Sequence, residues 1–145
     1  SSEGLPIANQ LQLLLQNDAY VEIWNQGTVF GLGDAMLEAL EAATITYDFG
    51  IFIFSPDDEL YSRGEIKTVA RDNVIFEAGL FIGKLGRRRV FVVQPQGQQI
   101  VLPTDFHGIT TATFNPNATN KAAALGPVAE TIRQAIDRAK VADFA

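Results

Sequence analysis

Two short apolar runs restrict the folds that this chain can adopt. One is nearly continuous over residues 48–54 and stops at Ser55-Pro56, and the other covers residues 89–93. Both are rich in β-branched and aromatic residues, as strands covered on both faces are. A helical pattern at residues 72–84 separates them. The order strand, helix, strand predicts parallel pairing in one sheet with helices packed on both of its faces.

The segments before the first run continue this alternation. Residues 6–16 carry apolar side chains at spacings of three and four and predict a helix, with Pro6 in its first turn. Residues 20–24 alternate as a short strand does. A glycine-containing loop then leads into a second helix. Its predicted buried side consists of Met36, Leu37, Leu40 and Ala43.

The remaining segments predict loops, an edge strand and a closing helix. Residues 57–71 are mostly polar and predict a long loop, and the glutamine-rich residues 94–99 predict a surface loop. Residues 109–114 predict a weaker edge strand. An amphipathic helix then runs to about residue 142, and its start is open. Pro127 fits a first turn, but Asn120 can cap an earlier one. The side chains expected to point inward are Val128, Ile132 and Ile136.

Chain length and composition fit one α/β domain over residues 1–145. A chain of 145 residues has the usual size of a single domain, and 47% apolar residues with ten Phe can build its core. We therefore expect a three-layer, flavodoxin-like fold with a central parallel sheet. The sequence starts in a loop and a helix, so the first strand of such a sheet is expected to be absent from it.

Charge and residue usage exclude several classes of site. A net charge of −6 without a long basic run argues against nucleic-acid binding. The short run Arg87-Arg88-Arg89 predicts a solvated turn. The chain has no cysteine and one histidine, His107, in a polar turn, so no metal site is expected. No apolar run reaches the roughly 18 residues of a membrane span, and no signal peptide is visible, which predicts a cytoplasmic protein.

Glu77 stands out in the helix predicted over residues 72–84. The segment Val-Ile-Phe-Glu-Ala-Gly-Leu-Phe-Ile at residues 74–82 is apolar on every side except at Glu77. A helix that is apolar all round is typically buried. A buried carboxylate loses hydration worth several kcal/mol unless it is paired or hydrogen-bonded. Glu77 is therefore a candidate functional residue, and Gly79 and Gly83 are expected to let the helix pack closely against a neighbour.

Two other interpretations concern this region. Glu77 can be structural and pair with Arg63, Arg71 or Lys84. Separately, Gly31-x-Gly33 suggests a dinucleotide-binding fingerprint, but the third glycine is missing and the segment follows a loop rather than a strand end. As a Rossmann fingerprint the pattern fails.

The sequence resembles a bacterial family over nearly its whole length. Arg63-Gly64 and the segment Arg-Asp-Asn-Val-Ile-Phe-Glu-Ala-Gly-Leu-Phe-Ile-Gly at residues 71–83 look like TIR-like domains once described as predicted nucleotide-binding. The Ser-Ser-Glu-Gly-Leu of residues 1–5, the Trp-Asn-Gln-Gly of residues 24–27 and the Phe-Ser-Pro-Asp-Asp of residues 54–58 match the same pattern. These domains serve as effectors of antiphage systems driven by cyclic nucleotides.

The resemblance implies that the domain is an NAD⁺ glycohydrolase with Glu77 as its catalytic residue. NAD⁺ is then the substrate, and no cofactor is expected. Family members are often fused to a cyclic-dinucleotide sensor, commonly STING-like, and TIR domains often complete their active sites by self-association. The family's first strand ends just before the Ser-Ser-Glu-Gly loop and is absent here.

The chemistry of the reaction suits a buried carboxylate. Breaking the nicotinamide–ribose bond builds positive charge on the ribose, which a carboxylate stabilises more strongly at low dielectric than in water. Trp24 and Phe30 are candidates to stack on nicotinamide or adenine, although Phe30 can equally be a core residue. Arg63 and Arg71 are candidates for phosphate contacts, or tie the long loop to nearby acidic residues. The helix start at Ser2, Glu3 and Gly4 favours phosphate as well.

Two rival functions remain. One is a TIR-type adaptor that assembles without catalysis, in which Glu77 is structural and the loops between Gln26 and Gly33 form interfaces. The other is a hydrolase or transferase that uses the same pocket for a nucleotide other than NAD⁺.

Overall fold

A parallel sheet lies at the centre of the computed structural model, which describes residues 4–24, 33–54, 59–62, 65–68, 72–97 and 102–144. Its strands in the described residues are β1 (Gly50–Ile53), β4 (Val90–Pro95) and β5 (Thr110–Phe114), in the order β1-β4-β5. Strand β4 pairs in parallel with both neighbours. The predicted parallel sheet is confirmed. The predicted edge strand is confirmed as well, and it is β5.

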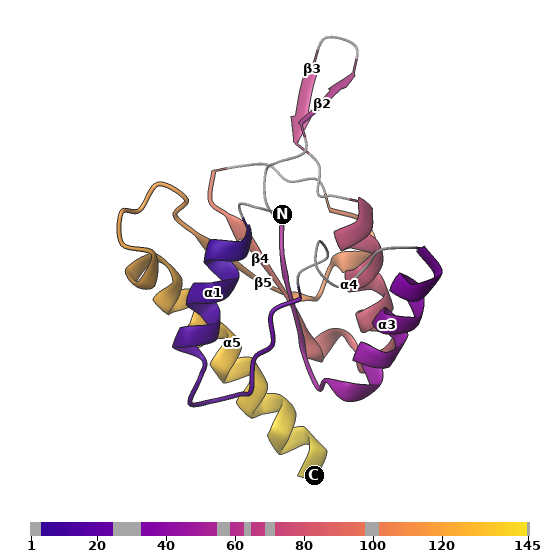
Figure 1. Cartoon of the computed structure of the whole chain (residues 1–145). Helices are drawn as coiled ribbons and strands as arrows, with labels where there is room; N and C mark the ends of the chain where they lie inside the picture. The colour runs from indigo at the N-terminus through magenta and orange to yellow at the C-terminus, as the bar shows by residue number, and fades with distance from the viewer. Residues whose placement is uncertain are drawn as a thin grey trace.

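Helices cover both faces of this sheet and make three layers (Figure 1). Helices α1 and α5 pack on one face, and α3 and α4 pack on the other. The helices are α1 (Gly4–Leu14), α3 (Gly33–Thr46), α4 (Asp72–Leu85) and α5 (Lys121–Phe144), with single 3₁₀ turns η1 (Arg87–Arg89) and η2 (Thr104–Phe106). The fold class expected from the sequence is therefore confirmed.

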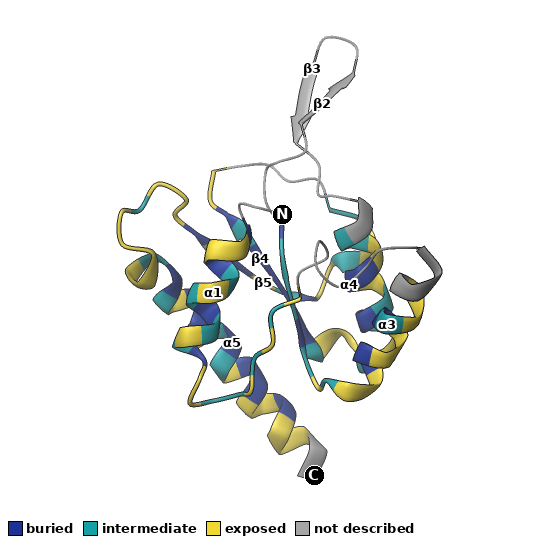
Figure 2. Cartoon of the chain, in the orientation of Figure 1, coloured by how far each residue is buried: buried dark blue, intermediate teal, exposed yellow. Residues whose placement is uncertain are grey.

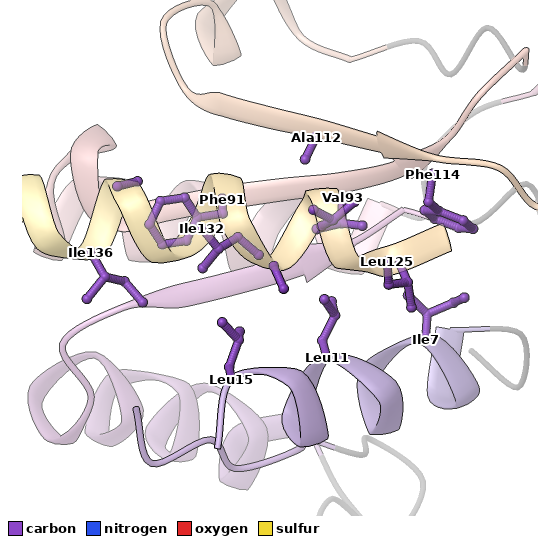
Figure 3. Close-up of a cluster of buried hydrophobic side chains, with 13 residues drawn as sticks. Ile7, Leu11, Leu15, Phe91, Val93, Ala112, Phe114, Leu125, Ile132 and Ile136 are labelled. Atoms are coloured by element: carbon purple, nitrogen blue, oxygen red, sulfur yellow. The ribbon is translucent and has the colours of Figure 1, made fainter. Parts of the chain in front are cut away.

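The α1–α5 face holds the larger apolar cluster, which we call the α1–α5 core (Figure 3). Side chains from both helices meet those of β4 and β5 there, and the predicted inward residues of α5 are all buried. Buried and exposed residues lie on different sides of α5 (Figure 2). The members labelled in Figure 3 are Ile7, Leu11, Leu15, Phe91, Val93, Ala112, Phe114, Leu125, Ile132 and Ile136.

An ion pair joins the end of α1 to α5. The Arg133 guanidinium donates to Asp18 Oδ2 at 2.9 Å and to the Leu14 carbonyl at 3.2 Å. Hydrogen bonds to Asp18 and then to Glu130 raise the pKa of Arg133. These contacts connect residues that are more than 100 positions apart in the sequence and fix α1 against the closing helix.

A second cluster, the α3–α4 core, packs on the other face. Its buried members are Ala43, Phe54, Phe81, Val90, Val92 and Ile109. Phe52 of β1 meets Phe81 of α4 edge-to-face, with ring centroids 5.4 Å apart. A Cβ added at Gly50 would lie only 2.9 Å from both rings, so this position requires glycine for close packing of α4 on β1. Leu37, predicted to be buried here, is 44% exposed.

Residues 20–24 do not form the predicted strand. They have no regular secondary structure, although their side chains alternate between partly buried and exposed as the sequence pattern requires. Within the described residues, no neighbouring strand pairs with them, and the Gln12 amide donates to the Val21 carbonyl at 2.8 Å instead. The alternation predicted the facing of the side chains correctly, but a strand also needs a partner for its backbone.

The prediction of a long loop over residues 57–71 is wrong in part. Strands β2 (Glu59–Ser62) and β3 (Glu65–Thr68) form an antiparallel hairpin with Ser62 opposite Glu65. Only the two residues Arg63-Gly64 separate them, a spacing that favours a hairpin. Because the segment is highly polar, its two short strands were not recognised from the sequence.

The open question about the closing helix is settled in favour of Asn120. Helix α5 begins at Lys121, and Asn120 Oδ1 accepts the backbone N–H of Ala123 at 3.1 Å, as an N-cap residue does. Pro127 lies inside the helix rather than at its start. In the described part of the chain, no helix combines the length and apolar character that a membrane span needs.

Both predicted polar turns are found. His107 is exposed beside Gly108, whose φ is +90°. Arg87 and Arg88 are exposed in η1. Arg89 differs, because it is partly buried, stacks 5.0 Å from the centre of the Phe49 ring and donates to the Asp48 carbonyl at 3.4 Å.

Candidate functional site

The topology brings α4 to the edge of the sheet where ligands bind in open α/β folds. Strand β1 ends at Ile53 at this carboxyl edge, and α4 starts there because it follows β1 and the hairpin and leads back to the start of β4. The hairpin projects beyond the same edge of the sheet, and α1 begins at that edge as well (Figure 1). Side chains in the first turns of α4 are therefore positioned close to the carboxyl ends of β1 and β4.

Glu77 is the sixth residue of α4 and is buried, with 6% of its surface exposed. Thr44 is the other buried polar residue in the part of the chain whose burial is described, and its hydroxyl donates to the Glu41 carbonyl at 2.6 Å. Glu77 is therefore the one buried carboxylate among these residues, as the sequence predicts. It takes part in at least one polar interaction, so it is held rather than isolated.

Helix α4 is not buried all round, which corrects the expectation from its composition. Phe76 is 56% exposed, and Gly79 and Gly83 are exposed on the same outer side. A Cβ at either glycine would meet nothing within 4 Å, so neither provides the predicted close packing. Apolar composition alone could not distinguish a helix buried on every side from one with an uncovered apolar face.

Five of the predicted substrate-binding residues lie outside the described residues. They are Ser2, Glu3, Phe30, Arg63 and Arg71. Of the other two, Gly4 is buried at the first position of α1, and Trp24 is 37% exposed at the end of a described segment. Gly4 and Glu77 thus come from the first turns of two helices that begin at one edge of the sheet (Figure 1). The structural alternative, in which Glu77 pairs with Arg63, Arg71 or Lys84, stays a prediction.

Gln94 is a polar residue of this edge that sequence reasoning placed in a surface loop. Gln94 and Pro95 are instead the last two residues of β4, and Gln94 is partly buried. Its side-chain oxygen Oε1 is enclosed, and no hydrogen-bond donor reaches it in the structure described here. The sequence feature that could have placed Gln94 in the strand was its position directly after the apolar run, one residue beyond Val93.

Two open surface hollows lie elsewhere. One, of about 300 Å³, is lined by residues 85–89 with Ala139 and Ala142, at the amino end of β4. The other, of about 440 Å³, is lined by Gln12 and residues 16–21. Neither is lined by Glu77 or Gln94. Among the described residues, no three His, Cys, Asp or Glu side chains gather as metal ligands.

A parallel sheet between two helical layers, with a buried carboxylate in the helix at its carboxyl edge, is a three-layer α/β domain. The sequence model of the family described as "CAP12/Pycsar effector protein, TIR domain" matches residues 1–116. The match covers most of the chain, and the chain belongs to this family.

Similar proteins agree with this assignment. The Pycsar effector protein PaPycTIR of Pseudomonas aeruginosa is 45% identical over 115 residues, which are 79% of this chain and 37% of that protein. BcPycTIR of Burkholderia cepacia is 37% identical over 138 residues, 94% of this chain and 45% of that protein. CD-NTase-associated protein 12 of Flavobacterium daejeonense is 40% identical over 114 residues, 79% and 36% of the two chains. The chain spans less than half the length of these relatives.

Proposed function

We propose that this domain is an NAD⁺ glycohydrolase that cleaves the nicotinamide–ribose bond. The observation that carries the proposal is the burial of Glu77 in α4, close to the carboxyl edge of the sheet. A carboxylate is expensive to bury, and stability alone gives little reason to keep one in a helix of apolar residues. The family assignment supports the proposal, because it connects the chain to effector domains of the TIR type.

In this reaction, Glu77 would stabilise the positive charge of the transition state electrostatically. As the bond to nicotinamide breaks, the electron pair leaves with the ring nitrogen and the ribose becomes oxocarbenium-like. The leaving nicotinamide is neutral, so no acid has to protonate it. In bound NAD⁺ the positive charge lies on the nicotinamide ring, and it moves onto the ribose as the bond breaks. A buried carboxylate against the ribose therefore stabilises the transition state more than the bound substrate, which is the requirement for rate acceleration. The same carboxylate can orient the ribose hydroxyls or the attacking water.

The other predicted contacts complete the substrate site in this proposal. The helix start at Ser2, Glu3 and Gly4 presents backbone N–H groups to the pyrophosphate. Trp24 and Phe30 stack on the rings, and Arg63 and Arg71 pair with phosphate oxygens. NAD⁺ is the substrate, and no cofactor takes part.

For the whole protein, we propose a role as a cytoplasmic antiphage effector that self-association switches on. The relatives are named Pycsar effectors and CD-NTase-associated proteins, and they are more than twice as long as the segment they share with this chain. A cyclic-nucleotide sensor, fused or separate, would then bring TIR domains together.

One observation favours a non-catalytic assembly module as the second candidate. Phe76 is 56% exposed on α4, beside the exposed Gly79. In that case the apolar surface of α4 serves self-association, and Glu77 holds the helix in place.

Loss of NAD⁺ in solutions of the intact protein tests the proposal. Wild type, Glu77→Gln and Glu77→Ala are compared at high concentration, with a crowding agent and after fusion to a dimerising tag. We expect Glu77→Gln to be slower by about 10²-fold or more, the loss typical of a preorganised charge at a reacting centre. Glu38→Gln, on the exposed side of α3, is the matched control and should retain wild-type turnover.

The results separate the candidates. Equal turnover by wild type and a folded Glu77→Gln would remove Glu77 from the chemistry. If clustered, folded wild type leaves NAD⁺ intact, the assembly module becomes the better candidate. A panel of other nucleotides then tests for a different substrate of the same pocket.

A further inference from the structure

The Gln94 side chain has a buried oxygen atom without a hydrogen-bond donor in the described part of the chain. Its Oε1 atom is enclosed, and among the described residues no N–H or O–H group donates to it. A buried polar atom without a partner destabilises a fold, so native proteins keep few of them. Each such atom calls for an explanation, such as a bound water or ion or a catalytic role. An apolar side chain of the same length would pack there without this penalty.

The position of Gln94 in the sheet shows where a missing partner would come from. Side chains alternate along β4, so that Val90 and Val92 belong to the α3–α4 core while Phe91 and Val93 belong to the α1–α5 core. Gln94 follows this alternation and lies on the same face of the sheet as α4.

The described strand neighbours of Gln94 on that face do not donate to its Oε1 atom. The pairing of β1 with β4 ends at Ile53 opposite Val93, which puts Phe54 beside Gln94. Phe54 is 1% exposed and apolar. On the other side, Gln94 pairs in register with Thr113 of β5, whose side chain is exposed. Gln94 thus follows the apolar residues under α4 at the carboxyl end of the central strand.

Gln94 and Glu77 share one face and one edge of the sheet. Glu77 lies near the start of α4, and Gln94 is the second-last residue of the central strand. Helix α4 packs on both β1 and β4. A ligand at the carboxyl edge that reaches Glu77 would therefore extend over the end of β4.

We propose that Gln94 is a substrate-contacting residue of the site that contains Glu77, and that its amide oxygen accepts an N–H of the nicotinamide carboxamide. This inference rests on the proposed function. NAD⁺ has two N–H donors on its rings, the carboxamide of nicotinamide and the amine of adenine. Glu77 acts at the nicotinamide ribose, so the carboxamide is the donor nearest to it, whereas the adenine amine lies beyond the pyrophosphate.

The contact would do two things. It would orient the nicotinamide ring as the bond to ribose breaks, and it would favour substrates whose ring carries an amide. A site with a buried acceptor rejects an analogue that lacks the donor, because the acceptor then stays unpaired. Gln94 is thus a specificity-determining residue for the leaving group.

The test compares substrates and variants in one cycle. The intact protein, clustered by a dimerising tag, is assayed with NAD⁺ and with 3-acetylpyridine adenine dinucleotide, which replaces the carboxamide –NH₂ by a methyl group. The quantity of interest is the ratio of the two kcat/KM values, in wild type and in Gln94→Met. Intrinsic differences in leaving-group reactivity cancel in this comparison. We expect the preference for NAD⁺ to fall by about 10-fold or more in Gln94→Met.

Two further measurements exclude a merely structural role. Gln94→Met and Gln94→Leu remove an unpaired acceptor, so Tm should stay constant or rise by about 2–4 °C. A structural hydrogen bond at Gln94 would make Tm fall instead. Gln96→Met is the matched control, since Gln96 is exposed two residues further on. It should change neither Tm nor the substrate ratio.

Each outcome decides the assignment. An unchanged ratio in folded Gln94→Met, with wild type active on NAD⁺, would overturn the role of Gln94 and leave the proposed function intact. Nicotinamide hypoxanthine dinucleotide, which lacks the adenine amine, probes the other donor. If Gln94→Met instead loses the preference for NAD⁺ over this analogue, the carboxamide contact is wrong. If clustered wild type does not cleave NAD⁺ at all, the proposed function fails and the Gln94 assignment fails with it.

Discussion

The two faces of the sheet are built from the same strands but differ in what they bury. The α1–α5 core is larger and its buried members are apolar. Both buried polar residues in the described part of the chain, Thr44 and Glu77, belong to the helices of the other face. The enclosed oxygen of Gln94 lies on that face as well. One face thus buries an apolar cluster, and the other combines an apolar core with buried polar groups.

Strand β4 connects these two roles. Its alternate residues point to opposite faces, so Phe91 and Val93 fill the α1–α5 core while Val90, Val92 and Gln94 belong to the α3–α4 side. The strand is held rigidly by a neighbour on each edge. A polar group at its end therefore has a well-defined position, which is what a substrate site needs. The comparison predicts that damage to one face lowers stability alone, whereas damage to the other also changes activity.

The largest expected effect is on stability, from Ile132→Ala in the α1–α5 core. Ile132 of α5 is fully buried in this core (Figure 3). Its truncation leaves a cavity and should lower the free energy of unfolding by about 2–5 kcal/mol. Chemical denaturation measures this loss, and NAD⁺ turnover per folded molecule should stay at the wild-type level.

Lys140→Ala, at an exposed position of α5, is the control and should change stability little. If Ile132→Ala lowers turnover per folded molecule as strongly as it lowers stability, the two faces are not independent and the comparison fails.

A smaller effect on stability, but one coupled to activity, is expected from Gly50→Ala. The added Cβ would lie 2.9 Å from the rings of Phe52 and Phe81, the pair that packs α4 on β1. Overpacking of this kind destabilises by about 1–3 kcal/mol. Because α4 carries Glu77, turnover per folded molecule should fall as well. Both quantities are measured on the same samples, by denaturation and by NAD⁺ loss.

Gly126→Ala in α5 is the matched control, since a Cβ there meets nothing within 4 Å. It should leave turnover unchanged. Full activity in folded Gly50→Ala would show that the Phe52–Phe81 contact does not set the position of Glu77.

The architecture was predictable because burial on both faces leaves a strong mark in a sequence. The runs at residues 48–54 and 89–93 have no polar face, and the structure confirms both as neighbouring parallel strands. Glu77 was recognisable as the one charge in the apolar segment of residues 74–82. Its burial is confirmed, while its catalytic role stays a prediction.

The errors arose where local pattern does not determine structure. Residues 20–24 alternate correctly, but strand formation depends on a partner that the segment itself does not contain. The hairpin at residues 59–68 was hidden because its strands are short and polar. Gln94 was assigned to a loop by its glutamine-rich neighbours, although the end of β4 continues past Val93. The substrate contacts at Ser2, Glu3, Phe30, Arg63 and Arg71 stay predictions.

The smallest expected effect distinguishes the two sides of α4 itself. Gly79 is exposed inside the helix, and a Cβ there meets nothing within 4 Å. Gly79→Ala should therefore stabilise the fold by about 0.5–1 kcal/mol, because alanine loses less conformational freedom in a helix. Glu77, two residues earlier, faces inward and should be unaffected, so turnover per folded molecule should stay constant. If Gly79→Ala lowers turnover in the dimerised protein but not its stability, the outer side of α4 takes part in the active assembly, and activity depends on both sides of the helix.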